Sequence, residues 1–453
     1  MPKQTQHRTA HAAEKPLTHL RQHLEAFLLP ILQPNQTLLL AFSGGLDSRV
    51  LLELLASLQK SLGFTLRAMY VHHGLSSNAD EWAEFCQTIC ASLHVPLSIS
   101  KVKVANDRGT GIEAAARSVR YQALYADPAD YIVLAHHEDD QAETLLLQLL
   151  RGSGAKGLSA MAMHDENRRL LRPLLDIPRS ELLAFAKQKN LHWIEDESNE
   201  NLSYDRNYCR HQVLPVIEQR FPAAKQTLAR SASHIAEASW LLDELAEIDA
   251  LNYVKEGQLS VAGLASLSEA RARNLLRWWL TSHRQNLPTA QRLQEMLRQL
   301  LSARNDASIK IAVDSANGVW LRRYREFAYV EFNAIDLPIA MVWQGEAELH
   351  LPDHSRLLFE RAKGQGLAME RLGINKLRIS HRLGGERFKP ELSKPTRTLK
   401  HLLQEANIPP WQRERLPLVY SDDVLAVVPG IGVAWSLQAG PDEIGLVISW
   451  QAS

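Results

Sequence analysis

The fold of the first part of this chain is decided by one stretch, Thr37-Leu38-Leu39-Leu40-Ala41-Phe42-Ser43-Gly44-Gly45-Leu46-Asp47-Ser48. Residues 37–42 form an almost continuous apolar run, which is typical of a buried strand, and an amphipathic helix is expected over 50–62. The two glycines between them allow the backbone to turn tightly and to approach a ligand closely. Because the start of a helix presents free N–H groups and a positive dipole end, this turn predicts a site for a phosphate chain.

The polar side chains of this turn divide into donors and an acceptor. Ser43 and Ser48 can donate hydrogen bonds to phosphate oxygens, whereas the Asp47 carboxylate can only accept them. We therefore expect Asp47 to hold Mg²⁺ that bridges phosphate oxygens. An ordinary strand-to-helix turn with a serine cap would carry the same residues, so the six residues by themselves leave that alternative open.

Outward from this stretch, short apolar runs alternate with longer amphipathic ones. Strands are expected at 66–72, 97–104 and 131–135, and helices at 80–93, 112–126 and 140–150. This alternation predicts an α/β domain with a Rossmann-like parallel sheet that helices cover on both faces. Ligands of such domains bind at the carboxyl ends of the strands, which is where the Ser43 turn lies.

The length of 453 residues predicts two or three domains. We assign the α/β domain to residues 17–221. The pattern changes at Phe221-Pro222, and a mainly helical middle domain with a small sheet is expected over 222–335. The strand-rich remainder, with one helix near 396–406, predicts a small α+β C-terminal domain over 336–453.

Two further segments carry candidate catalytic side chains. Residues 136–144 end the fourth strand and open its helix, and Asp140 and Glu143 share one face of that helix because they are three apart. Acidic residues in a first helical turn can equally serve the helix dipole. Arg117, at the start of another helix, could neutralise phosphate charge in a transition state, or could be an ordinary solvated arginine.

Several competing motifs are excluded. No Gly-Lys dipeptide occurs, so the chain has no Walker A loop, and Ala41 stands where a nucleophile elbow requires glycine. The single Gly-x-Gly-x-x-Gly match, 152–157, follows a helix instead of a strand, so we reject a dinucleotide site there. The His-Glu pair at 137–138 lacks the second histidine of a zinc protease.

Composition limits the class of protein. The chain has 51 basic and 51 acidic residues and three cysteines, Cys86, Cys90 and Cys209. An odd and small number of cysteines argues against a disulfide framework and suits a reducing compartment, and Cys86 and Cys90 are expected inside one helix. With no apolar run of 18 residues and a polar first 16 residues, we expect a cytoplasmic protein without a membrane partner.

Although the chain is neutral overall, one segment is strongly basic. Residues 371–415 hold eleven Lys or Arg and four acids, a difference of seven positive charges. The basic residues are Arg371, Lys376, Arg378, Arg382, Arg387, Lys389, Lys394, Arg397, Lys400, Arg413 and Arg415. Such a segment is typical of a surface that binds a nucleic-acid backbone, and a solvated basic face is the alternative. Trp411 could stack on a base or belong to the core.

The Ser43–Ser48 loop resembles that of the PP-loop ATP pyrophosphatases, and the chain as a whole resembles the tRNA(Ile)-lysidine synthase family within that superfamily. The resemblance covers about residues 35–440. It rests on Val71-His72-His73-Gly74-Leu75-Ser76, on 113–117 with Arg120-Tyr121, and on 136–144, 151–154, 172–175, 195–199, 204–207 and 384–388, followed by Leu399-Lys400 and Leu402-Leu403.

The resemblance implies a reaction and a set of roles. In that family ATP adenylates C2 of the wobble cytidine in the CAU anticodon of an isoleucine tRNA, and the amine of free lysine then displaces AMP. The implied cofactors are ATP and Mg²⁺, and a homodimer is possible. Ser43, Gly44, Gly45, Leu46, Asp47 and Ser48 would bind ATP, Asp47, Arg117 and Asp140 would act in adenylation, Glu143 would bind the lysine ammonium, and Arg206, Arg387, Lys389 and Lys400 would bind tRNA.

Three rivals stay open from the residues alone. A tRNA thiolase of the same superfamily would be expected to carry paired catalytic or cluster-binding cysteines, which Cys86, Cys90 and Cys209 do not supply. A small-molecule amide ligase would not need a basic C-terminal domain. An RNA-binding protein with a relict nucleotide fold would release no pyrophosphate.

Overall fold

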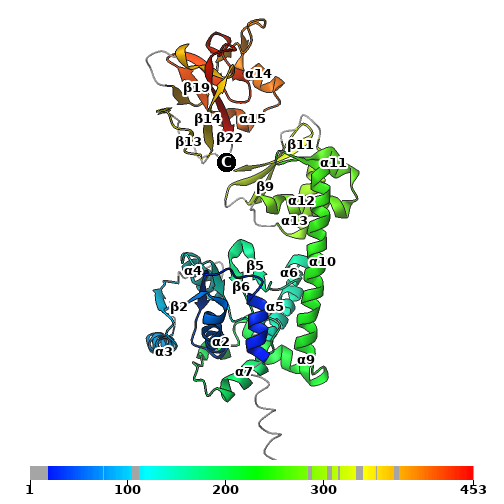
Figure 1. Cartoon of the computed structure of the whole chain (residues 1–453). Coiled ribbons are helices and arrows are strands. Elements are labelled where there is room, and N and C mark those ends of the chain that lie inside the picture. Colours follow the sequence, from blue (N-terminus) through cyan, green and yellow to red (C-terminus); the bar gives the residue numbers. More distant parts are fainter. Residues whose placement is uncertain are drawn as a thin grey trace, which may run out of the picture. The chain divides into compact units, whose positions relative to one another are not determined.

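The computed structural model describes residues 19–74, 76–104, 112–283, 288–303, 309–314, 317–332, 340–353, 355–371 and 377–451. The chain forms two compact units, Met1–Leu245 and Ala246–Ser453. One helix, α10 (Ala224–Tyr253), runs through the residue at which the units divide (Figure 1). Each unit is described by itself below.

Unit 1 is built on a six-stranded sheet with the order β3-β2-β1-β4-β6-β5. Its strands are β1 (Thr37–Ala41), β2 (Thr65–His72), β3 (Leu97–Lys101), β4 (Tyr131–Val133), β5 (His164–Asp165) and β6 (Leu170–Leu171). All neighbours are parallel except β5, which pairs antiparallel with β6 at one edge. The predicted parallel α/β core is confirmed, and the antiparallel edge is an addition to it.

Helices cover both faces of this sheet, as predicted. They are α2 (Leu46–Leu62), α3 (Ala79–Ser92), α4 (Ile112–Tyr125), α5 (Glu138–Leu150), α6 (Ala155–Leu158), α7 (Arg179–Gln188), α8 (Asp205–Tyr208) and α9 (Leu214–Arg220), with a helix also at 19–28. In β1, Leu38 and Leu40 belong to the core that contains α2, α3 and α7. Leu39 points to the opposite face and joins Leu124 of α4. This alternation follows from the two-residue period of a strand.

The order of the strands brings the predicted motifs together. From β1 the chain adds β2 and β3 on one side and then returns to add β4 on the other side of β1. The order in which strands are added therefore reverses between β1 and β4, although the strands are parallel. The loop after β1 and the loop after β4 consequently open at the same edge, where ligands of such sheets bind. Helix α2 begins at Leu46, four residues before the predicted start, because the extended Gly45 is its N-cap. Leu46, Asp47 and Ser48 are therefore its first turn.

Unit 2 begins with a helical layer packed on a five-stranded antiparallel sheet of order β7-β8-β11-β10-β9. The helices are α11 (Val261–Ser266), α12 (Glu269–Ser282) and α13 (Ala290–Ser302). The strands are β7 (Val254–Lys255), β8 (Gln258–Ser260), β9 (Ile309–Asp314), β10 (Val319–Tyr324) and β11 (Phe327–Phe332). The predicted helices and small sheet of this region are confirmed.

The rest of unit 2 is an α+β arrangement of small antiparallel sheets. Its strands are β12 (Ala340–Val342), β13 (Glu348–His350), β14 (Arg356–Lys363), β15 (Leu367–Ala368), β16 (Arg378–Ser380), β17 (Arg387–Phe388), β18 (Arg397–Thr398), β19 (Leu418–Ser421), β20 (Val424–Val428), β21 (Gly432–Val433) and β22 (Ile444–Gln451). Its helices are α14 (Leu399–Glu405) and α15 (Pro410–Arg415).

The role of Trp411 is structural. Its side chain is 8% exposed and makes edge contacts with Tyr324 and Tyr329, at ring-centre distances of 6.2 and 5.6 Å. Arg413 of the same helix, α15, donates a hydrogen bond of 2.9 Å to the Tyr324 hydroxyl. Trp411 thus joins α15 to the β10–β11 hairpin, and it is core rather than a platform for a base.

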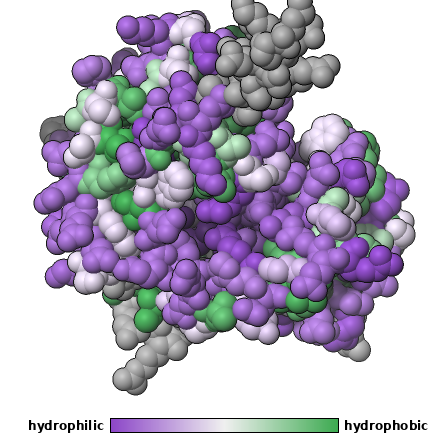
Figure 2. All heavy atoms as spheres, turned by 90° about the horizontal axis from the view of Figure 1, so that it is seen from below, coloured by the Kyte–Doolittle hydropathy of each residue, from purple (hydrophilic) through white to green (hydrophobic). Residues whose placement is uncertain are grey.

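Figure 2 shows one face of the molecule, on which hydrophilic residues dominate and hydrophobic ones form small groups. Within the residues that the structure describes, no helix is both long and apolar enough to cross a bilayer.

Candidate functional site

The loop after β1 has a conformation that only glycine suits at one position. Gly44 has φ +79°, in the left-handed region, and a Cβ there would lie 2.4 Å from Cδ1 of Ile194 and 3.0 Å from Sγ of Cys86. The Gly44 carbonyl accepts a hydrogen bond of 2.9 Å from the Ile194 N–H. The loop is therefore held against residue 194 on one side while its other side leads into α2.

Around this loop the hydroxyls form a compact cluster of their own. Ser43 Oγ and Ser48 Oγ are 3.1 Å apart, and Ser48 Oγ donates to the Gly45 carbonyl at 3.0 Å. The first N–H groups of α2 have no partner within the helix. Donors and a positive dipole end are thus gathered at one point, which suits the phosphate chain that the sequence predicts.

Asp47 is the unusual member of the loop. Its Oδ1 is buried and makes no hydrogen bond to any described residue. Arg179 Nε of α7 lies 3.7 Å from that oxygen, and His137 Nε2 lies 3.6 Å from Oδ2. A buried carboxylate oxygen without a donor is costly, so it marks a position suited to a cation. Among the described residues, no group of three or more His, Cys, Asp or Glu is arranged to hold a metal ion.

His137 connects the two loops that open at this edge. Its ring is almost completely buried, and Nε2 lies 3.6 Å from Asp47 and 3.5 Å from Asp140. Burial lowers the pKa of His137, but the hydrogen bond with Asp47 and the charges of Asp140 and Asp47 outweigh it, so the net pKa is raised. The contacts of His137 with Asp47 and Asp140 therefore link the Asp47 loop to the start of α5.

Asp140 and Glu143 share one face of α5, as predicted, and both are bound by arginines. Arg206 donates to Asp140 Oδ1 at 2.8 Å and to Glu143 Oε2 at 2.9 Å. Arg210 donates to the same Asp140 oxygen at 3.1 Å and to Glu143 Oε1 at 2.6 Å. The Glu143 side chain is only 1% exposed. Burial alone would raise the pKa of Asp140, but the charges of His137 and the arginines lower it strongly.

The second arginine reaches these carboxylates through an irregular helix. Between α8 and α9 lies a turn of π-helix, η3 (Cys209–Val213), which contains Arg210. Pro215 in the first turn of α9 has no N–H and cannot form the hydrogen bond that would continue a regular α-helix. The widened turn is of the kind often found at functional sites, and here it contains the second of the two arginines that bind the α5 carboxylates.

The two arginines of α4 differ in their surroundings. Arg117 is exposed, and its guanidinium lies 5.2 Å from the centre of the Tyr121 ring. Arg120 is more buried, its Nε has no hydrogen-bond partner among the described residues, and burial lowers its pKa. Charge interactions with Arg120 contribute to the lowered pKa of both His73 and His136, although burial is the larger cause in each. His73, His136 and Arg120 therefore lie near one another, and the Arg120 guanidinium also contacts the Tyr121 ring, at 5.7 Å from its centre.

In unit 2, much of the basic segment is already engaged. Arg382 pairs with Glu386, Lys394 with Glu391, Arg397 with Glu405, and Arg415 with Asp353. In contrast, no carboxylate of the described residues forms an ion pair with Arg387, Lys389 or Lys400. Lys376 and the side chain of Arg371 lie outside the described residues. Three of the predicted tRNA-binding cations are therefore available for phosphate.

The turn before Arg387 is stabilised by the carboxylate of Glu386, which accepts hydrogen bonds from the backbone. Glu386 Oε1 accepts hydrogen bonds of 2.6 Å from the N–H groups of Leu383 and Gly384. Burial raises the pKa of Glu386, but these backbone donors and Arg382 lower it by more, so the group stays ionised. Gly384 and Gly385 have φ +90° and +83°, which explains the Gly-Gly-Glu sequence.

The cysteines have no thiolate character. Cys86 and Cys90 lie in α3, as predicted, and are 0% and 1% exposed. Burial raises the pKa of Cys86 to about 12 and that of Cys90 to about 11. The thiol of Cys209 is also buried, and burial raises its pKa. Buried neutral thiols do not attack or bind soft metals, which argues against thiolase chemistry.

The structure thus gathers Asp47, Asp140, Glu143 and Arg206 at one edge of unit 1, while Arg117 lies on the surface of α4. Arg206, expected to contact tRNA, is bound to two carboxylates of the site. Sequence reasoning missed His137, Arg179, Arg120 and Arg210 as individual members. The four-residue spacing of Arg206 and Arg210 could have indicated one pair of cations on a helix, whereas nothing in the sequence pointed to Arg179.

Comparison with known proteins finds three family matches along the chain. Residues 16–217 match the PP-loop domain family, 259–329 the TilS substrate binding domain and 377–450 the TilS substrate C-terminal domain. A solved structure with a likeness in fold is "U34-tRNA thiolase NcsA from Methanococcus maripaludis with its [4Fe-4S] cluster", at 18% identity and a TM-score of 0.42 over 49% of this chain and 80% of that chain.

Similar full-length proteins carry a common name. The tRNA(Ile)-lysidine synthase of Nitrosomonas europaea is 45% identical over 93% of this chain and 93% of its own length. The tRNA(Ile)-lysidine synthase of Azoarcus sp. is 41% identical over 92% of each chain. Because relatives of this name match more than nine-tenths of the chain at 45% and 41% identity, the chain belongs to the tRNA(Ile)-lysidine synthase family.

Proposed function

We propose that this chain joins free lysine to C2 of the wobble cytidine in the CAU anticodon of isoleucine tRNA. In the first step the cytosine O2 attacks the α-phosphorus of ATP, and pyrophosphate leaves. In the second, the lysine amine attacks C2 and loses a proton, and AMP leaves with the original oxygen. The modified base then pairs with adenine, so decoding and charging change from methionine to isoleucine.

The observation that carries this proposal is the phosphate loop together with Asp47 Oδ1, a buried carboxylate oxygen that accepts no hydrogen bond from a described residue. Ser43, Ser48 and the first N–H groups of α2 would bind the phosphates, and Asp47 Oδ1 would face the ion that accompanies them. That ion, Mg²⁺, would offset the charge that develops on the leaving pyrophosphate. Fixed donors at this position cost no reorganisation during the reaction, which is the main source of their effect.

Roles for the charged groups beside the loop follow from their positions. Asp140 would hold His137 and the two arginines in place, and through His137 would orient Asp47. Arg117 would act on the adenylating phosphate after leaving the Tyr121 ring, against which it rests. These are roles in adenylation, so loss of either side chain should reduce turnover more than tRNA affinity.

Glu143 is proposed to bind the ammonium of lysine. In the structure both of its oxygens are held by Arg206 and Arg210, so lysine would have to displace one arginine donor. Glu143→Gln removes the charge and keeps the size. We expect it to raise the lysine concentration required for half-maximal ligation by at least about tenfold, with ATP–pyrophosphate chemistry intact. Lost adenylation with an unchanged lysine requirement would instead assign Glu143 to the nucleotide.

The division of labour is proposed to follow the three predicted domains. Residues 17–221 would perform the chemistry, and 222–335 and 336–453 would bind the body of the tRNA, with Arg387, Lys389 and Lys400 on phosphates. Arg206 would contact tRNA only with those of its donors that Asp140 and Glu143 leave free.

One assay tests the whole proposal. The chain is incubated with ATP, radiolabelled lysine and either isoleucine tRNA with a CAU anticodon or methionine tRNA. Label should enter only the isoleucine tRNA, with one pyrophosphate and one AMP formed for each lysine incorporated. Pyrophosphate release without label in tRNA would point to a small-molecule ligase, and the absence of any pyrophosphate to a binding protein.

A further inference from the structure

Trp435 stands out among the C-terminal tryptophans because its side chain is exposed. It is 41% exposed, whereas Trp411 is 8% exposed. Trp343 stacks on Phe359, and the indole N–H of Trp450 donates to Ser355. In contrast, no described residue accepts a hydrogen bond from the Trp435 indole N–H. An exposed aromatic ring costs hydration free energy, so a ring that folding leaves uncovered is a candidate contact for a ligand.

One neighbour of this ring is a cation. The Lys389 ammonium lies 5.3 Å from the centre of the Trp435 ring, and Lys389 has no carboxylate partner among the described residues. Arg387, two residues earlier, is exposed and also lacks such a partner. A flat π face beside unpaired cations is the arrangement with which proteins bind unpaired nucleotides, because the base stacks on the ring and its phosphate meets the cations.

Hydrogen bonds fix the backbone around Trp435. The backbone N–H of Trp435 donates a hydrogen bond of 3.0 Å to the Lys389 carbonyl. Gln438 Nε2 donates to the carbonyls of Pro390 and Val433, at 2.6 and 2.9 Å, and so ties the two segments together. The backbone that carries the ring is therefore already ordered, which reduces part of the entropic cost of binding a ligand.

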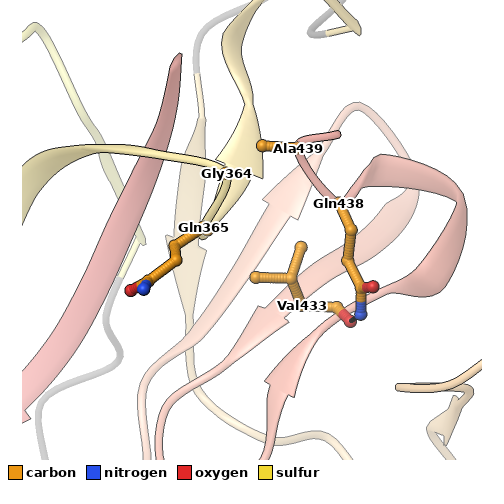
Figure 3. Close-up of a pocket in the computed structure, with 6 residues that line it drawn as sticks. Gly364, Gln365, Val433, Gln438 and Ala439 are labelled. Atoms are coloured by element: carbon orange, nitrogen blue, oxygen red, sulfur yellow. Dashed lines mark hydrogen bonds between the residues drawn. The ribbon is translucent and has the colours of Figure 1, made fainter. Parts of the chain in front are cut away.

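On either side of Trp435 in the chain, Val433 and Gln438 line a hollow of about 280 Å³. It is lined by Gly364, Gln365, Gly366, Val433, Gln438 and Ala439. Figure 3 shows the Gln438 side chain alongside Val433, with Gln365 pointing the other way. None of the lining residues is charged.

We propose that Trp435 is a stacking platform for an unpaired nucleobase of the RNA substrate, with Lys389 neutralising the adjacent phosphate. This inference rests on the proposed function, since it requires an RNA ligand. It adds a residue outside the basic side chains and a kind of contact that does not depend on charge. Stacking and phosphate pairing respond differently to salt, and this difference makes the two contributions separable.

The test compares full-length Trp435→Ala, Trp435→Leu and Trp435→Phe by tRNA affinity over a range of salt concentrations. Loss of one stacked base should weaken binding by about 5- to 150-fold in the Ala and Leu variants. The Phe variant should retain most of the affinity. The slope of log affinity against log salt should stay as in the wild type, whereas Lys389→Met should flatten it by about one unit.

Controls separate stacking from a structural effect. Val424→Ala, a change to another exposed apolar side chain of the same sheet region, should bind as the wild type does. The Trp435 variants should keep the wild-type unfolding temperature and should bind a fully paired RNA duplex without loss. A Leu variant that binds tRNA as tightly as the wild type, or an equal loss on duplex and tRNA, would overturn the platform. If Lys389→Met keeps the wild-type affinity and salt slope as well, the proposed RNA surface itself fails.

Discussion

At the scale of single residues, the site is defined by groups that folding leaves unsatisfied. Asp47 Oδ1, Arg120 Nε and His136 Nδ1 are buried without hydrogen bonds to described residues. Each such atom costs free energy, about 1–3 kcal/mol for a typical polar group, unless a ligand supplies the missing partner. Such atoms also occur elsewhere, at Arg67, His164 and His381, so they indicate a binding position only where, as at Asp47, they lie within the loop after β1.

The first prediction concerns Asp47. Asp47→Ala should abolish pyrophosphate release at saturating ATP, because the variant loses the oxygen proposed to face Mg²⁺. The fold should persist, since Asp47 Oδ1 has no hydrogen bond to a described residue and the contact of Oδ2 with His137 is long, at 3.6 Å. The measurement is pyrophosphate release beside Glu84→Ala, a control at an exposed carboxylate of α3. Activity within about threefold of the wild type, less than 1 kcal/mol of barrier, would contradict the assignment.

A second residue-scale prediction compares the arginines of α4. Arg117→Ala should lower turnover at least about tenfold and leave tRNA affinity within about twofold, if Arg117 acts in the transition state. Arg120→Gln is the comparison, because Arg120 is the arginine whose Nε is buried without a partner. Single-turnover adenylation and tRNA binding are measured for both variants. Weakened tRNA binding with normal adenylation would make Arg117 a contact residue, and a large effect only at Arg120 would move the role there.

At the scale of elements, the helix over 19–28 is stabilised by a contact of His23 whose strength depends on pH. His23 Nε2 lies 3.1 Å from Asp176 Oδ1 and 3.0 Å from the Pro173 carbonyl. The hydrogen bond with Asp176 raises the pKa of His23 and outweighs the lowering by burial. Because the folded pKa lies above the unfolded value, this stabilisation is fully present below about pH 6.5. It is lost as the pH rises through the folded pKa.

The corresponding prediction uses His23→Gln, which keeps a donor and removes the charge. Amide hydrogen exchange in residues 19–28 should be faster in the variant than in the wild type at pH 6. The difference between the two proteins should disappear as the pH rises through the folded pKa of His23, once exchange is corrected for its intrinsic pH dependence. A difference that does not change with pH would mean that the contact acts only through its neutral hydrogen bond.

Element by element, the sequence predicted most of the regular structure. The four early strands and their helices follow from apolar periodicity, and their predicted ends agree with the structure to within a few residues. Two features could not be read in this way. The β5–β6 edge is formed by strands of only two residues each, too short for a periodic pattern. The π-helical turn at Cys209–Val213 depends on a proline and on the carboxylates that Arg210 meets, so it arises from tertiary contacts.

The site was predictable to the extent that it lies within one segment. Asp140 and Glu143 are three residues apart, and their shared face followed from helical spacing alone. Their arginine partners are more than 60 residues away in the chain, so no local pattern links them. The same holds for Arg179, which reaches Asp47 from the start of α7. For Trp411, only burial could decide between a core residue and a base platform.

At the scale of the whole molecule, the proposed chemistry and the proposed phosphate contacts lie on different compact units. Replacing Arg387, Lys389 and Lys400 together with Ala should therefore weaken tRNA binding more than it lowers turnover at saturating tRNA. The salt slope of binding should flatten by up to about one unit for each lost contact. Lys363→Ala is the matched control, since Lys363 is already paired with Asp442. Unchanged affinity and slope in the triple variant would make the positive charge a solvated face.

The buried thiol beneath the phosphate loop has a practical consequence. Cys86 is fully buried and protonated, and its sulfur lies against Gly44, so an alkylating reagent can reach it only when the loop or α3 opens. The rate at which Cys86 is modified then measures how often the loop or α3 opens, in the native chain and without any attached label. A nucleotide that holds the loop closed should lower the rate of Cys86 modification. The decrease in rate at each nucleotide concentration then reports the fraction of molecules whose loop is occupied.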